Sequence, residues 1–155
     1  MDGSGVEGQA VRRHPAFRRA ANFAFHPENE AAGHFLAERI ARLAVPARDR
    51  RAVLALGHGA GGGVAAPDLQ ALASGLPGRG VEVVLVEQPW VVAGRKLAPA
   101  PKTLDAGWTP VAEAVRKAAS EAPFLVGGRS AGARVACRTG AASGAVGVVA
   151  LAFPL

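Results

Sequence analysis

The sequence predicts an α/β protein, a three-layer α/β/α sandwich built on a mostly parallel sheet. Short, continuous apolar runs recur along the chain, and the stretches between them have the spacing of amphipathic helices. Such runs are typical of strands that are buried on both faces, as in a parallel sheet. Strands that alternate with helices form βαβ units, whose helices cover both faces of the sheet.

The elements can be placed in order along the chain. We expect strands near 52–57, 82–87, 124–128 and 146–152. We expect helices near 67–73, 108–120 and 131–139, and a long loop rich in proline, glycine and lysine over 88–107. A loop of that length inside a compact domain is usually functional or mobile.

Residues 1–50 differ from the rest of the chain. Residues 1–27 are polar and rich in arginine, and they predict an irregular arm. Residues 28–44 carry apolar side chains at helical spacing and predict an amphipathic helix, which Pro46 ends. We therefore divide the chain into an arm with a helix, residues 1–50, and one domain, residues 51–155.

Composition excludes several classes of function. Half of the 155 residues are hydrophobic, which suits a globular domain with a core. The net charge of +6 is spread along the chain rather than gathered on one element, so we expect no nucleic-acid partner.

Features of the sequence also favour a cytoplasmic location. Cys137 is the only cysteine, so no disulfide can form within the chain. We place Cys137 in the helix after Ser130, with its side chain in the protein core rather than reactive. The N-terminus lacks the apolar centre of a signal peptide. The longest apolar run, Ala145 to Leu155, is too short to span a bilayer, so we expect no membrane partner.

One motif indicates nucleophilic chemistry. Gly128-Arg129-Ser130-Ala131-Gly132 fits the pattern G-x-S-x-G of a nucleophile elbow, and it lies between an expected strand and an expected helix. The serine of such an elbow has a strained backbone, and Gly128 and Gly132 leave room for the sharp turn. A short motif can arise by chance in a glycine-rich chain, but this one occurs where the mechanism requires it.

A second motif follows the first strand of the domain. Residues 57–63 are rich in glycine, and in α/β-hydrolases a loop at this place supplies one N–H of the oxyanion hole. The two donors would be the backbone N–H groups of Ala60 and Ala131. Gly59 would let the loop approach the substrate, and His58 would brace the loop rather than act as the catalytic base.

The same loop has a rival interpretation. Gly57-x-Gly59-x-x-Gly62 matches a dinucleotide-binding fingerprint, and Glu87 ends the next strand where a ribose-binding acid would lie. The helix starts too late for that motif, and Ser130 would have no role. A phosphate-binding loop of the Walker A type is excluded, because no Gly-Lys-Ser/Thr follows.

With both motifs placed, the chain resembles the α/β-hydrolase family of testis-expressed protein 30 and the third subunit of the NSL chromatin complex. Its bacterial members are small hydrolases related to dienelactone hydrolase. The stretches that carry the resemblance are Leu54 to Gly62, Val86 to Pro101, Thr103 to Trp108, Val126 to Ala136 and Ala150 to Leu155. It covers residues 51–155 and not residues 1–50, where a short β-hairpin would be expected.

The resemblance implies a catalytic order of Ser, Asp and His, with Ser130 as the nucleophile and no cofactor. After Ser130 the sequence has no Asp, Glu or His. We therefore expect a hydrolase fold truncated after its fourth recognisable strand. The isolated chain should be poorly soluble and inactive on small acyl esters.

Two classes of function stay open. One is a hydrolase of an ester, thioester or related acyl bond in a small molecule, without a metal. Arg129 and Trp90 would then be possible substrate contacts, and Arg95 and Lys96 lie in the same long loop as Trp90. The other is a non-catalytic scaffold with the α/β-hydrolase fold, as the resemblance to a chromatin subunit suggests.

Overall fold

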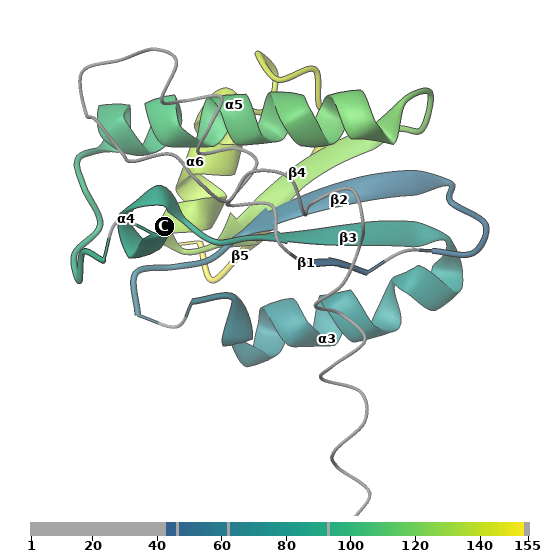
Figure 1. Ribbon diagram of the computed structural model, residues 1–155, viewed down its shortest axis with the longest axis horizontal. Coiled ribbons are helices and arrows are strands. Elements are labelled where there is room, and N and C mark those ends of the chain that lie inside the picture. Colours follow the sequence, from purple (N-terminus) through teal and green to yellow (C-terminus); the bar gives the residue numbers. More distant parts are fainter. Residues whose placement is uncertain (1–42, 46, 62, 93, 154–155) are drawn as a thin grey trace, which may run out of the picture.

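The computed structural model describes residues 43–45, 47–61, 63–92 and 94–153. These residues form a five-stranded sheet in the order β1-β3-β2-β4-β5 (Figure 1). The strands are β1 (Leu43–Val45), β2 (Ala52–Gly57), β3 (Val81–Val86), β4 (Phe124–Arg129) and β5 (Gly147–Leu151). The strands β2 to β5 run parallel, and β1 pairs antiparallel with β3. The predicted fold class is confirmed.

Helices cover both faces of this sheet (Figure 1). On one face lies α3 (Pro67–Gly75); on the other lie α5 (Pro101–Ala119) and α6 (Ala131–Thr139). The short helix α4 (Pro89–Val92) follows β3, and two turns of 3₁₀ helix, η2 (Gly63–Ala65) and η3 (Pro77–Arg79), flank α3. Both α3 and α5 begin with proline, whose missing N–H has no partner in a first turn anyway.

The core is divided by the sheet into two clusters. Along β2, Val53 and Ala55 point to the face of α5 and α6, while Leu54 and Leu56 point to the face of α3. Successive side chains of a strand alternate between faces, so a continuous apolar run serves both clusters. The cluster under α5 and α6 is the larger one and contains both tryptophans, Trp90 and Trp108.

The strand register places the ends of β2, β3 and β4 next to one another at one edge of the sheet. Gly57, the last residue of β2, is paired with Val86 of β3 on one side and with Gly128 of β4 on the other. The segments that follow these three strands therefore start side by side, at the left in Figure 1. In open α/β sheets this carboxyl edge is where ligands bind.

The long loop predicted over 88–107 is wrong in part. Helix α4 lies inside it, and α5 begins at Pro101 rather than at Trp108. The prolines of this stretch indicate a loop, yet Pro101 occupies the first turn, where proline is favoured. Leu104 and Trp108, one helical turn apart, are then both buried on the inner face.

The helix predicted over 28–44 is also wrong at its end. Leu43 and Ala44 belong to β1, where they pair with Leu85 and Val84 of β3. The sheet thus extends across the division that we placed after residue 50. The remainder of that predicted helix and the arm over 1–27 lie outside the described residues.

Candidate active site

Ser130 lies at the sharp turn between β4 and α6. Its backbone angles are φ 52° and ψ −108°, a conformation that is strained for any residue with a side chain. The Ser130 N–H donates to the carbonyl oxygen of Leu151 at 3.0 Å, and the Ser130 carbonyl accepts from the N–H of Arg134 at 3.1 Å. Hydrogen bonds to β5 and to the first turn of α6 thus hold the strained residue, as a nucleophile elbow requires.

The two glycines of the motif are required by close backbone packing. A Cβ atom on Gly128 would lie 2.3 Å from the carbonyl oxygen of Gly57, and a Cβ atom on Gly132 would lie 2.3 Å from the same oxygen. Real Cβ atoms do not approach an oxygen so closely. The elbow therefore crosses the end of β2 at a distance that only glycine allows on both sides of Ser130.

The glycine-rich loop after β2 lies directly against this elbow. A Cβ atom on Gly59 would be 3.2 Å from the Cβ of Ser130 and 3.3 Å from the carbonyl oxygen of Arg129. Ala60 comes next and is exposed, while Ala131 begins α6. Ala60 therefore follows a residue that packs against Ser130, and Ala131 follows Ser130 itself.

The structure gives His58 a different environment from that of a catalytic base. The ring is fully buried; its Nδ1–H donates to the carbonyl oxygen of Gly59 at 2.7 Å, and its Nε2 accepts from the N–H of Gln88 at 2.9 Å. Burial lowers the pKa of His58, against the hydrogen bond to Gly59 and the charge of Glu87, which raise it. Both ring nitrogens are used, so neither is available to take a proton from Ser130.

Gln88 and Trp90 pack behind the loop, in the segment that leads into α4. Gln88 is fully buried, and its side-chain Nε2 donates a long bond of 3.5 Å to the His58 carbonyl. The ring of Trp90 meets the His58 ring edge-on, with the centroids 5.4 Å apart. Because Trp90 is only 2% exposed, its burial argues against the substrate contact that the sequence suggests. Gln88 is not among the residues that the sequence predicts for the site, and its shortest bond to His58 comes from its backbone N–H.

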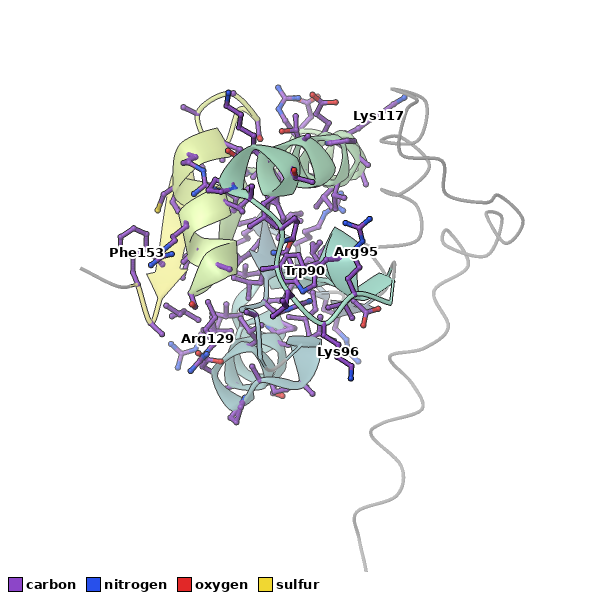
Figure 2. All side chains as sticks on the ribbon, turned by 90° about the vertical axis from the view of Figure 1, so that its left-hand side faces the viewer. Trp90, Arg95, Lys96, Lys117, Arg129 and Phe153 are labelled. Carbon is purple, nitrogen blue, oxygen red and sulfur yellow. The ribbon has the colours of Figure 1, made fainter. Side chains whose placement is uncertain are left out.

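Arg129 is the charged residue closest in sequence to Ser130. Its Nε lies 2.9 Å from a carboxylate oxygen of Asp68, in the first turn of α3, and its side chain is 43% exposed. A guanidinium nitrogen, Nη1, lies 3.8 Å from the place of a Cβ atom on Gly59. Figure 2 looks onto this edge of the molecule, with Arg129 on one side of Trp90 and the exposed Arg95 and Lys96 on the other.

Other predicted residues have simpler outcomes. Cys137 is exposed on the outer face of α6, which corrects its placement in the core. The inward positions of that helix are taken by small residues and by Val135. Between residues 43 and 153, His58 is the only histidine that the structure describes, so the described residues present no histidine to Ser130.

Among the described residues, no three side chains of His, Cys, Asp or Glu come together as metal ligands would. None of the helices in that part of the chain combines the length and the apolar character needed to cross a bilayer.

The sheet order, the elbow and the glycine loop define a protein with the α/β-hydrolase fold. The chain belongs to this family, because the sequence profile of the alpha/beta hydrolase domain matches residues 50–155. No curated protein matches the sequence significantly. The match identifies the broad family only, and neither it nor a curated relative supports the narrower resemblance to testis-expressed protein 30 and the NSL subunit.

Solved structures show the same fold. An α/β serine hydrolase without a lid from Xanthomonas campestris has a TM-score of 0.61 and 23% identity, over 70% of this chain and 53% of that one. A protein from Thermus thermophilus has a TM-score of 0.51 and 24% identity, over 70% and 50%. A thermostable carboxyl esterase from Bacillus coagulans has a TM-score of 0.55 and 16% identity, over 68% and 36%. The chain thus spans about half of the first two structures.

Proposed function

We propose that this chain is the nucleophile-bearing part of a serine hydrolase that cleaves an ester, thioester or related acyl bond in a small cytoplasmic molecule. The observation that carries the proposal is the strained backbone of Ser130 between two glycines that touch the end of β2. Strain of this kind persists where the surrounding structure enforces it, and it occurs most often at active sites.

The proposed reaction uses groups that the fold brings together. The Ser130 Oγ attacks the acyl carbonyl, a C–O bond forms, and the carbonyl electron pair moves to the oxygen. The N–H groups of Ala60 and Ala131 would stabilise this oxyanion. The electron pair then returns, the bond from the acyl carbon to the leaving oxygen or sulfur breaks, and the alcohol or thiol takes the proton that Oγ lost. Water attacks the acyl carbon in the same way, the bond to Oγ breaks, and the carboxylic acid leaves while Oγ regains a proton.

The base and its acid would come from outside the described residues. Oγ needs a base to take its proton and an acid to orient that base. His58 is committed to Gly59 and Gln88, and no Asp, Glu or His follows Ser130 in the sequence. The two hydrogen bonds of the buried His58 ring favour the second candidate function, a scaffold that keeps the fold and the elbow without turnover.

The dinucleotide-binding alternative has little support in the geometry. In that motif the helix opens within the glycine fingerprint, so that its N-terminus meets the phosphates. Here a turn of 3₁₀ helix intervenes and α3 begins only at Pro67. The glycine loop also packs against Ser130, which is the arrangement expected of an oxyanion loop.

Arg129 would give this hydrolase a preference for anionic substrates. Asp68 holds the guanidinium through Nε, and Nη1 lies 3.8 Å from the place of a Cβ atom on Gly59, which is itself next to Ser130. A carboxylate or phosphate close to the scissile acyl bond could contact this edge of the guanidinium. We assign no such role to the buried Trp90.

A fluorophosphonate probe separates the two candidate functions. The probe forms a covalent adduct only with an activated serine, and peptide mass spectrometry locates the adduct. We expect it on Ser130 when the chain is extended with a C-terminal segment that supplies Asp and His, and a clear reduction when the chain is expressed alone. Ser130→Ala controls for reaction at other sites. If Ser130 is unlabelled in both preparations, the scaffold function is correct.

A further inference from the structure

The orientation of one peptide group in the glycine loop follows from a single hydrogen bond. The Gly59 carbonyl accepts from the His58 Nδ1–H at 2.7 Å, so this carbonyl points at the buried ring. The carbonyl and the N–H of a trans peptide point in opposite directions, and the described residues contain no cis peptide. The Ala60 N–H therefore points away from the ring.

The bond depends on which nitrogen of the His58 ring carries the hydrogen. Backbone N–H groups can only donate, so the Gln88 N–H at 2.9 Å requires an unprotonated Nε2. In the neutral ring, the hydrogen must then be on Nδ1, the nitrogen that faces Gly59. Gln88 thus selects the tautomer that can hold the Gly59 carbonyl.

Without this bond the loop has an alternative. Gly59 lacks a side chain and tolerates a wide range of backbone angles, so the peptide between Gly59 and Ala60 can rotate at low cost. Rotation by half a turn would exchange the two ends of the peptide. A carbonyl oxygen would then occupy the place of the N–H and repel a developing oxyanion instead of stabilising it.

We propose that His58 is a positioning residue that sets the direction of the Ala60 N–H, with the Gln88 backbone selecting its tautomer. The catalytic consequence rests on the proposed function of Ser130 and Ala60. The structural consequence, a fixed peptide orientation, does not depend on any activity. The two can therefore be tested separately.

Two substitutions of His58 separate its two hydrogen bonds. In His58→Asn, the side-chain amide nitrogen can take the place of Nδ1 and donate to Gly59, but nothing reaches Gln88. In His58→Gln, the longer side chain can place an amide oxygen where Nε2 accepts from Gln88, but the donor to Gly59 is lost. Each variant removes one buried hydrogen bond, so a purely structural role predicts similar effects for both.

Residual dipolar couplings of alanine-labelled chain report the direction of the Ala60 N–H. We expect the same coupling in the wild type and in His58→Asn, and a changed coupling in His58→Gln. An unchanged coupling in a folded His58→Gln variant would overturn the inference. If that variant does not fold, the ¹⁵N shifts of the wild-type His58 ring decide, because a proton on Nε2 rather than on Nδ1 also overturns it.

The rate of Ser130 modification supplies the second readout. We expect a loss of about a hundredfold in His58→Gln, comparable to the removal of one oxyanion donor, and less than about fivefold in His58→Asn. Equal losses that follow the stability of the two variants would overturn the positioning role. If wild-type Ser130 does not react while the couplings behave as expected, the proposed function fails and the positioning role stands.

Discussion

The elbow and the glycine loop meet at Ser130, yet they are held in opposite ways. The elbow is fixed by the absence of side chains, since Gly128 and Gly132 both press against the Gly57 carbonyl. The loop is fixed by the presence of one, since the buried His58 ring bonds to Gly59 and Gln88. A steric fit should tolerate no added atom, whereas a hydrogen-bonded fit should tolerate a side chain that keeps the bond.

The largest effect is expected for an added methyl group at the elbow. Gly132→Ala places a Cβ atom 2.3 Å from a backbone oxygen, so the strand and the helix must separate. We expect the free energy of unfolding to fall by about 3 kcal/mol or more, measured by urea denaturation. Gly61→Ala is the matched control, because no atom lies within 4 Å of its added Cβ. Equal losses in the two variants would mean that the elbow is not sterically fixed.

The pH dependence of stability tests the hydrogen-bonded loop. The pKa of His58 in the folded chain lies below its ordinary value of 6.5, chiefly because the ring is buried. The unfolded state therefore binds the proton first as the pH falls. The stability due to neutral His58 is complete above pH 6.5 and is lost as the pH falls from there through the folded pKa, by at most about 1.4 kcal/mol per pH unit.

Urea denaturation of the wild type and of His58→Asn over this pH range measures the effect. The difference between the two curves isolates His58 from the titratable groups that both proteins share. We expect the wild type to lose stability relative to the variant as the medium becomes acidic. A constant difference would show that His58 does not change its charge on unfolding.

Ser130→Gly should reveal the strain in the elbow. Glycine adopts positive φ without a steric penalty, so we expect this variant to be more stable than Ser130→Ala by about 1 kcal/mol. Both variants lack the serine hydroxyl, so the difference between their free energies of unfolding, measured by thermal or chemical unfolding, does not include the loss of that group. If Ser130→Ala is the more stable of the two, the backbone at this residue is not strained.

The smallest effect on stability is expected at the rim of the site. The ion pair between Arg129 and Asp68 is partly exposed, so Arg129→Met should change the free energy of unfolding by less than about 1 kcal/mol. Its effect should instead be on selectivity. In the active preparation, the ratio of kcat/KM for a half-ester of succinate to that for a neutral butyrate ester should fall about fivefold, the range of one partly exposed charge contact. An unchanged ratio would remove Arg129 from substrate recognition.

The sequence predicted the strands and the elbow because their signals are local. The four parallel strands are continuous apolar runs. The two glycines at positions 128 and 132, on either side of Ser130, indicate by their spacing a turn too tight for larger residues. The catalytic roles of Ser130 and the two oxyanion donors stay predictions, and the structure brings the glycine loop to the serine.

The missed features depend on contacts between distant parts of the chain. Leu43 and Ala44 have helical spacing, and only pairing with β3 makes them a strand. Proline breaks a helix at most positions, whereas Pro101 stands in the first turn of α5, where proline is tolerated. The role of Gln88 could not be predicted from its side chain, because the group that bonds to His58 is a backbone N–H, which every residue other than proline possesses.

The hydrogen bond from Ser130 to Leu151 has a consequence for the order in which the site matures. On the ribosome, Ser130 leaves the exit tunnel before Leu151, so the elbow is made before its last anchor exists. Until β5 docks, the Ser130 N–H has no strand partner and the turn can relax. The strained turn at Ser130 should therefore become fixed only when β5 has joined the sheet, so that this feature of the β4–α6 turn forms late although its own residues are made early.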